Sequence, residues 1–338
     1  MRKLKLLPVL LGLLAVASVA SAAPRYDFII CANVNKGYVI GSKIVTTNGL
    51  FRLNDAGEWI HFGYNDSTIT GAAFDPRDPS VYYTSALNGL WAPLEGSVTG
   101  RMANSWDMTE GRDVAIDPNA PDDVYFCFTD GVGFTNDRGL TVQRRDHGLP
   151  ARGKFTEAIE VDRTTAGRVF AACTAGVYLT DDAGRNWRQV LSAKAQVNDI
   201  QQSPHDASEW IAVTDEDGAW LSRDRGLTWT QIKGVPSEHA LYNIAFDPTN
   251  AQRIVIGSWT YGVLASEDNG ATWTTRNAGL PENPRAWRVG VNPNTGRLYA
   301  SIYQETLYHS DDFGRTWQAD VLAGSLVNRF VSVPRVNR

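Results

Sequence analysis

The sequence is poor in the residue types on which most metal, redox and nucleophilic sites depend. Its 338 residues include three cysteines, three methionines and five histidines, and the histidines, at 61, 147, 205, 239 and 309, show no metal-ligand spacing. It contains no Gly-x-Ser-x-Gly elbow and no phosphate-binding loop. The acidic stretch 214–218 (TDEDG) lacks the third alternating acid and the distal Glu of a calcium loop. We therefore expect no metal site and no cofactor.

Long apolar runs are absent except near the N-terminus. Three basic residues precede the apolar segment 6–19, and residues 20–22 (ASA) form a small-residue cleavage site. The segment is too short to span a bilayer as a helix, and no later segment is apolar enough to do so. No cysteine stands at the cleavage point to carry a lipid. We expect a signal peptide over 1–22, cleaved after Ala22, and a single secreted or periplasmic domain over 23–338 without a membrane anchor.

An excess of positive charge is also absent. The chain has a net charge of −5, and loss of the three basic residues of the signal peptide leaves −8. An acidic protein is a poor partner for nucleic acid or for an acidic membrane surface. The remaining composition has much Trp, Tyr, Gly and Asp and no low-complexity tract, which is typical of an ordered globular domain. We expect a monomer.

The three cysteines are predicted to be small buried apolar residues. Cys127 and Cys173 lie on the second strands of adjacent repeats, one position out of register, and so on opposite faces of their sheets. Packed sheets stand about 10 Å apart, which is beyond the reach of a disulfide. We give Cys31 the same interpretation.

What the sequence does contain is one motif several times over. Residues 222–229 are SRDRGLTW, and variants occur at 180–187, 266–273 and 310–317, with a copy lacking the Trp at 135–142 and a shortened copy at 53–59. The glycines of the five longer copies are 45, 42, 44 and 44 residues apart. The gap of 82 residues before them has room for a degenerate copy, NGLWAPLEG at 88–96. This spacing predicts seven structural units.

Each unit has a second landmark ahead of its motif. Short apolar alternations that end in an Asx-Pro or similar turn predict first strands at 69–76, 111–118, 156–163, 197–204, 241–248 and 286–293. A second strand follows, a third leads into the motif and a fourth leaves it. Seven such units predict an all-β, seven-bladed β-propeller of four-stranded antiparallel blades, with a six-bladed ring as the alternative. The segment 327–335 reads as a first strand without a hairpin, so we expect it to complete the first blade and close the ring.

The motif S/T-x-D-x-G-x-T-W is similar to the Asp-box, or BNR repeat, and the chain resembles the sialidase-like Asp-box propeller superfamily over its mature length. That superfamily holds sialidases, xyloglucan-active hydrolases, the sortilin receptor domain and photosystem-assembly propellers, so the resemblance implies the fold and leaves the function open. It also implies that these turns lie on the outer rim, away from the ligand. An Asp that accepts backbone N–H bonds and a Gly with positive φ explain the turn chemically. We interpret Asp137, Asp182, Asp224, Asp268 and Asp312 as buried structural carboxylates.

Candidate site residues lie where the first strands begin, because loops from all blades converge at that face of a propeller. The charged and polar members of this ring are Arg112, Asp113, Glu157, Asn198, Asp199, Tyr242, Asn243, Trp287, Arg288, Asn328 and Arg329. Three carboxylates and three guanidiniums around a channel mouth indicate a ligand site. The alternative is a set of ion pairs that line a water-filled channel.

A second set of candidates follows the second strands. Trp259, Tyr261 and Tyr303 are aromatic residues in loops of neighbouring blades. Flat aromatic faces suit the apolar face of a sugar ring, and the alternative is that these rings pack between blades. The predicted ligand-binding set is Arg112, Asp113, Glu157, Asp199, Asn243, Trp259, Tyr261, Trp287, Arg288, Tyr303 and Arg329.

We predict recognition of a glycan or an extracytoplasmic protein at this face. The alternative is a glycoside hydrolase that uses Asp113, Glu157 or Asp199, because neighbouring blades can hold two carboxylates about 6.5–9.5 Å apart, as inversion requires. The sialidase motif F/Y-R-I-P is absent from the N-terminal region. An assembly factor for an envelope complex is a third alternative.

Overall fold

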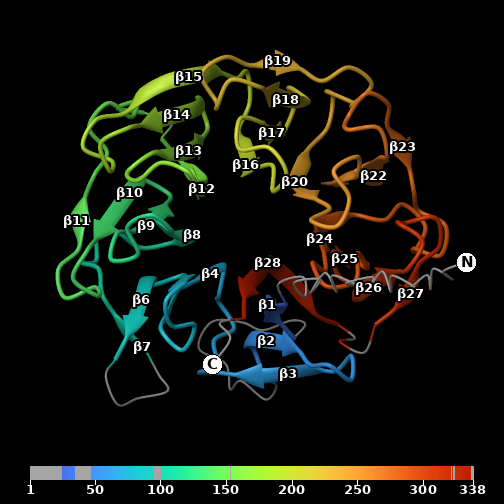
Figure 1. Cartoon of the computed structure of the whole chain (residues 1–338), viewed down its shortest axis with the longest axis horizontal. Helices are drawn as coiled ribbons and strands as arrows, with labels where there is room; N and C mark the ends of the chain where they lie inside the picture. The colour runs from blue at the N-terminus through green and yellow to red at the C-terminus, as the bar shows by residue number, and fades with distance from the viewer. Residues whose placement is uncertain are drawn as a thin grey trace, which may run out of the picture.

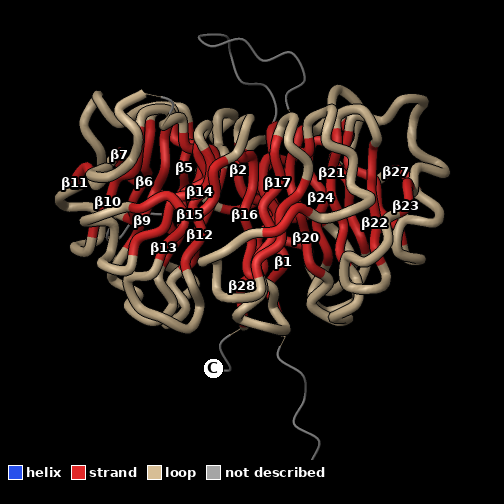
Figure 2. Tube along the Cα trace, turned by 90° about the horizontal axis from the view of Figure 1, so that it is seen from above, coloured by secondary structure: helices blue, strands red, loops and turns tan. Residues whose placement is uncertain are grey.

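The computed structural model describes residues 25–34, 47–94, 100–152, 154–320, 322 and 324–335. The predicted signal peptide lies outside this part of the chain. The described residues form seven four-stranded antiparallel sheets arranged in a ring, with no helix among them (Figure 1). Consequently no described segment is a helix long and apolar enough to cross a membrane. The strands run between two loop faces (Figure 2).

Blades are numbered in chain order, and each is given from its innermost strand outwards. Blade 1 consists of β28 (Leu326–Pro334), β1 (Tyr26–Asn33), β2 (Gly49–Leu53) and β3 (Trp59–Phe62). Blade 2 consists of β4 (Gly71–Phe74), β5 (Tyr82–Ala86), β6 (Gly89–Pro93) and β7 (Gly100–Met102), and blade 3 of β8 (Gly111–Ile116), β9 (Val124–Phe128), β10 (Gly131–Thr135) and β11 (Gln143–Arg144). Blade 4 consists of β12 (Thr156–Val161), β13 (Val169–Cys173), β14 (Gly176–Thr180) and β15 (Arg188–Ser192). Blade 5 consists of β16 (Val197–Gln202), β17 (Trp210–Thr214), β18 (Ala219–Ser222) and β19 (Thr230–Gln231). Blade 6 consists of β20 (Leu241–Phe246), β21 (Ile254–Ser258), β22 (Gly262–Ser266) and β23 (Thr274–Thr275). Blade 7 consists of β24 (Ala286–Val291), β25 (Leu298–Ile302), β26 (Leu307–Ser310) and β27 (Gln318–Ala319).

The ring is closed by the C-terminal strand. β28 pairs antiparallel with β1, with Ile30 opposite Phe330, and becomes the innermost strand of blade 1. Joining the two ends of the chain in one sheet gives blade 1 the same four strands as the other six blades and closes the ring. The predicted seven blades and the predicted closure are confirmed, and the six-bladed alternative is wrong.

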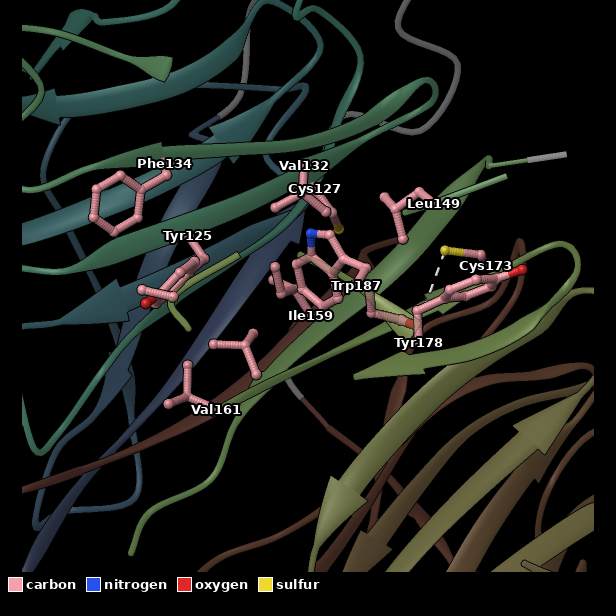
Figure 3. Packing of buried hydrophobic residues seen from close by; sticks show 13 residues of the cluster. Tyr125, Cys127, Val132, Phe134, Leu149, Ile159, Val161, Cys173, Tyr178 and Trp187 are labelled. Carbon is pink, nitrogen blue, oxygen red and sulfur yellow. Dashed lines mark hydrogen bonds between the residues drawn. The ribbon is translucent and has the colours of Figure 1, made fainter. Parts of the chain in front are cut away.

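Alternation along the second strands builds the core between blades. In β9, Tyr125 and Cys127 turn toward blade 4, whereas Phe126 and Phe128 turn toward blade 2. Side chains that follow one another along a strand point to opposite faces of the sheet, so one strand supplies two apolar layers. Figure 3 shows the layer between blades 3 and 4, where Trp187 lies among residues of both sheets.

The cysteines are free and buried, as the sequence predicts. Cys127 and Cys173 do lie on opposite faces of their own sheets, and because these sheets are neighbours both thiols enter the same layer (Figure 3). The two remain separate there. Burial raises the pKa of Cys173 to about 12 and that of Cys31 and Cys127 above the usual range. All three are therefore protonated and unreactive at neutral pH.

The repeated motif forms the turn between the third and fourth strands. In blade 5 the carboxylate of Asp224 accepts hydrogen bonds from the backbone N–H of Thr228 at 2.9 Å and of Leu227 at 3.1 Å, and from the Ser222 hydroxyl at 2.8 Å. The Ser222 hydroxyl accepts from the Gly226 N–H at 2.9 Å. Arg225 and Gly226 both have positive φ, at 65° and 76°. The predicted Asp and Gly roles are therefore present, together with a second left-handed residue that the pattern did not reveal.

Two details of this turn differ from expectation. The five Asp carboxylates are half-exposed or exposed rather than buried, because the turns project from the rim into solvent. The Trp side chains also fall into two kinds. Trp187 and Trp317 are buried and donate to carbonyls of the preceding blade, whereas Trp229 and Trp273 donate to the Gly carbonyl of their own turn. Only the first kind links neighbouring blades through a hydrogen bond.

Candidate functional site at the channel mouth

Six of the seven innermost strands carry a β-bulge near their N-terminal end. In β8, for example, Gly111 pairs with Phe128 and Asp113 pairs with Cys127, which leaves Arg112 unpaired. The residues skipped in this way are Arg112, Glu157, Asn198, Tyr242, Trp287 and Asn328. A bulge re-aims the extra side chain and ends regular pairing. The structure therefore brings the predicted ring together at one face, here called the channel-mouth face.

In β8, β16 and β20 the polar side chain after the bulge fastens two blades together. Asp113 accepts from the backbone N–H of Val114 at 2.9 Å and of Ile159 in blade 4 at 3.4 Å. Asp199 and Asn243 repeat this pattern toward the next blade: Asp199 accepts from Ile244 N–H at 3.1 Å, and Asn243 bonds both the N–H and the carbonyl of Val289. These three polar side chains are buried and their groups are satisfied by protein.

Arg329 crosses the channel to reach two of these carboxylates. Its Nη2 lies 3.0 Å from Asp113 Oδ2, and its Nη1 lies 3.5 Å from Asp199 Oδ1. The carboxylates are 2% and 1% exposed. Burial raises the pKa of both Asp113 and Asp199, and the attraction of Arg329 opposes that rise. One guanidinium from the last strand thus joins blades 1, 3 and 5.

Glu157 forms a second charged group nearer the mouth. Its carboxylate lies 3.3 Å from Arg112 Nε and 3.8 Å from Arg288 Nη2. Arg288 also donates to the carbonyls of Asn328 and Trp287, at 3.0 and 2.9 Å. Burial raises the pKa of Glu157, against the opposing effect of the two arginines. The charged members of the predicted ring therefore form ion pairs with one another, and their role in ligand binding stays a prediction.

Aromatic side chains occupy the mouth over blades 6 and 7. The aromatic shelf consists of Tyr242, Trp259, Trp287 and Tyr303, which contact one another with ring centroids 4.6 to 5.6 Å apart. All four are half-buried. Two predicted loop aromatics, Trp259 and Tyr303, thus lie together beside two residues from bulges. Tyr261 lies elsewhere: it contacts His239 and packs against the core between blades 5 and 6.

Arg285 belongs to this shelf and was missed by the sequence reasoning. Its guanidinium lies over the rings of Trp259 and Tyr303, at 5.1 and 5.2 Å from their centroids. It donates to Gln304 at 3.2 Å and, among the described residues, has no ion pair with a carboxylate. A signal was available, because Arg285 directly precedes the predicted first strand at 286–293 and so lies beside the candidates Trp287 and Arg288.

The channel below the mouth contains a cavity of about 180 Å³. It is lined by residues of β16, β20, β24 and β28 and extends from Arg288 and Arg329 toward Pro204 and Pro248 at the far ends of the strands. None of Asp113, Glu157 and Asp199 lines it. Glu160 supplies another carboxyl group in the channel, besides those of Asp113, Glu157 and Asp199. Its side chain has no hydrogen bond or ion pair among the described residues, and burial raises its pKa to about 7.

The partners of the three candidate carboxyl groups can be compared with what glycoside hydrolysis requires. Two carboxyl groups with separate roles must face each other across open space that admits a sugar and a water. Asp113 and Asp199 share one arginine and hold backbone N–H groups, and Glu157 lies between two arginines. Among the described residues, no three His, Cys, Asp or Glu side chains form a group that could hold a metal ion.

Comparison with known proteins places the fold among related propellers. The family model described as sortilin, neurotensin receptor 3, matches residues 217–325. An oligoxyloglucan-reducing end-specific xyloglucanase of Emericella nidulans is 28% identical over 235 residues, which cover 65% of this chain and 24% of that enzyme. The chain therefore spans about a quarter of the length of this curated relative.

Solved structures agree on the fold. The GH74 enzyme of Niastella koreensis superposes with a TM-score of 0.65 at 16% identity, over 80% of this chain and 50% of that one. YCF48 bound to D1 peptide superposes with a TM-score of 0.55 at 20% identity, over 76% of this chain and 83% of that one. At these identities the likeness shows the fold alone. The chain is similar to propellers of several functions, and the matches agree with the Asp-box propeller superfamily that its repeated motif indicates.

Proposed function

We propose that this protein is a secreted or periplasmic recognition module that binds a partner at its channel-mouth face, through the aromatic shelf and Arg285. The supporting observation is the pattern of bulges, which turns six side chains of the innermost strands toward one face. Bulges next to a site re-aim side chains, and aromatic residues with arginine are the types most enriched in binding hot spots.

The shelf favours a protein partner over a glycan. A sugar stacks on an uncovered ring face, and here neighbours cover much of the rings. Trp287 has the Arg288 guanidinium 4.2 Å from its centroid and Tyr242 at 4.6 Å. Trp259 is contacted by Arg285, Tyr242 and Tyr303. The half-buried rings and the Arg285 guanidinium, which has no carboxylate partner among the described residues, suit the carbonyls and carboxylates of a protein.

Two comparisons support the two ligand classes. YCF48, which this chain resembles in fold, is described as bound to a D1 peptide, and it is covered over 83% of its length. The xyloglucanase relative is matched over only 24% of its length. A glycan ligand is therefore the second candidate.

A glycoside hydrolase is the third candidate, and its residues have other partners. Asp113 and Asp199 are held by Arg329 and by backbone N–H groups, and Glu157 is held by Arg112 and Arg288. A general acid has to give its proton to the leaving oxygen, so a carboxylate already committed to an arginine and two amides is poorly placed for the task.

The test compares arrays of immobilised peptides and glycans probed with the labelled protein. We expect binding to peptides that Arg285→Ala and Tyr303→Ala each weaken at least about thirtyfold, since hot-spot truncations cost about 2 kcal/mol or more. Leu227→Ala on the opposite rim is the matched control and should bind as the wild type does. Binding confined to glycans would replace the protein partner with a glycan. Release of sugar that Asp113→Asn abolishes would overturn the proposal.

A further inference from the structure

A second feature of the channel-mouth face lies over blades 2 and 3, away from the aromatic shelf. Residues 104–110, here called the Trp106 loop, connect β7 to the start of β8. They therefore lie at the end of β8 that carries the bulge. Trp106 is 77% exposed, the largest exposed fraction of any large apolar residue in the described part of the chain. A soluble protein gains nothing in folding stability from an indole left in water.

Two buried side chains, those of Asn104 and Met108, anchor the loop that carries Trp106. Asn104 is 6% exposed; its Oδ1 accepts from the Leu90 N–H at 2.6 Å, and its Nδ2 donates to the Met108 carbonyl at 2.8 Å and the Asn88 carbonyl at 3.2 Å. Met108 is 4% exposed and enters the core of blades 2 and 3. Two buried side chains thus flank the exposed one. A loop ordered in advance loses little conformational entropy on binding.

A charged network fixes the other side of the loop and orients its charges. The guanidinium of Arg144 contacts Asp107, Asp130 and Asp146, and Lys154 contacts Asp130 and Asp146. The side chains of the two cations are 28% and 18% exposed, whereas those of Asp107 and Asp130 are 65% and 63% exposed. The cations therefore lie inward and the carboxylates face solvent.

Glu110 adds a further carboxylate at the end of the loop. It is exposed, and its side chain has no ion pair or hydrogen bond among the described residues. Its backbone has a φ of 57°, and its N–H donates to the carbonyl of Leu87 at 2.7 Å. Leu87 is itself 38% exposed. The surface consisting of Trp106, Leu87, Asp107, Glu110 and Asp130 is thus apolar at its centre and negative around it.

We propose that this surface is a docking site for a basic segment of a partner protein, with a lysine or arginine side chain lying over the face of Trp106. An ammonium or guanidinium group is attracted to an indole face, and the apolar stem of the side chain covers the ring. Outward-facing carboxylates beside the ring add charge complementarity and increase the association rate. The site does not depend on the aromatic shelf, which has an arginine and selects the opposite charge.

The experiment is isothermal titration of the whole protein with three twelve-residue peptides in which Gly-Ser is interrupted by lysine, arginine or glutamate. We expect the lysine and arginine peptides to bind and the glutamate peptide not to bind, with affinity falling as salt rises. Trp106→Ala should weaken binding about three- to fivefold, as loss of one cation–π contact predicts, and Asp107→Asn with Glu110→Gln should weaken it further. These side chains are exposed, so the variants should keep the wild-type Tm.

Leu140→Ala is the matched control, since Leu140 is 75% exposed on a rim turn of blade 3, and it should leave binding unchanged. Equal binding of the glutamate peptide would overturn the proposal. So would binding that survives Trp106→Ala but is lost in Arg285→Ala, because this assigns the peptides to the aromatic shelf. Chitosan oligosaccharide binding to the same surface while the basic peptides do not bind would show that the partner class is wrong.

Discussion

Replacement of Arg329 by methionine tests whether the charges of the channel stabilise the ring. In the wild-type protein, Arg329 Nη2 lies 3.0 Å from Asp113 and Nη1 lies 3.5 Å from Asp199, and both carboxylates are at most 2% exposed. Methionine retains the apolar length and removes the charge. The two buried carboxylates then keep only backbone N–H donors and, for Asp199, the side-chain amide of Gln201 at 3.2 Å. Removing one partner of a buried ion pair costs about 3–5 kcal/mol. We expect a loss in that range at pH 7.5.

The pH dependence of this loss separates charge from packing. Burial already raises the pKa of Asp113 and Asp199 in the wild-type protein, and removal of the opposing arginine raises it further. Protonation then relieves the repulsion as the pH falls, so the difference between variant and wild type shrinks toward pH 5, by up to about 1.4 kcal/mol per carboxyl and pH unit. A loss caused by packing alone would be the same at both pH values.

The assay is urea unfolding followed by tryptophan fluorescence at pH 7.5 and pH 5. Arg335→Met is the matched control, because Arg335 pairs with Asp27 and Asp55 at the surface and should cost less than about 1 kcal/mol. The triple variant Asp113→Asn, Asp199→Asn, Arg329→Met should recover part of the loss. A loss below about 1 kcal/mol for Arg329→Met, or one independent of pH, would refute the reasoning.

Three further predictions concern single sites. Burial holds the pKa of Glu160 at about 7, above its unfolded value, so the wild-type protein loses stability as the pH rises from about 4.5 to 7. Glu160→Gln should therefore raise the free energy of unfolding by up to about 3 kcal/mol at pH 8 and by little at pH 4.5. An equal gain at both pH values would contradict this. The hydroxyl of Thr228 helps to lower the pKa of Asp224 to about 2, so the contribution of the Asp224 carboxylate to stability is complete above about pH 4 and is lost as the pH falls toward 2. Asp224→Ala should lower the free energy of unfolding in urea by about 1–2 kcal/mol at pH 7 and by less at pH 2.5. A loss that persists at pH 2.5 would count against the hydrogen bonds as its cause. A Cβ at Gly133 would lie 2.1 Å from the buried ring of Phe126, so Gly133→Ala should lower stability by about 1–3 kcal/mol, and an unchanged Tm would show that the ring can move freely.

The fold was predictable because its information is local and repeated. A short Ser-x-Asp-x-Gly stretch makes its own turn through hydrogen bonds within eight residues, as Asp224 and Ser222 show, and its spacing counts the blades. The final strand, β28, was recognisable because it had the pattern of a first strand and no partner hairpin. The exposure of the turn carboxylates was not predictable in this way, since it depends on how far the rim projects.

The sequence predicted which residues lie at the candidate site, but it did not predict which of their charges are paired. Strand position nominated Arg112, Glu157 and Trp287 correctly as residues at the mouth, because all blades share one register. Whether a charge is free or paired depends on side chains from blades far apart in the sequence: Arg329 reaches Asp113 and Asp199, and Arg288 reaches Glu157. No local pattern contains those distances.

The sequence by itself therefore determined the number of blades, the closure of the ring and the face on which polar side chains gather. The tertiary structure decided which of them remain available to a partner. Bulges turn six side chains toward the channel-mouth face, the guanidinium groups of Arg285 and Arg288 lie over the rings of Trp259 and Trp287, and Trp106 is left exposed. The physical reason is that turn geometry is set by bonds between near neighbours, whereas burial and ion pairing are set by what the closed ring places opposite each side chain.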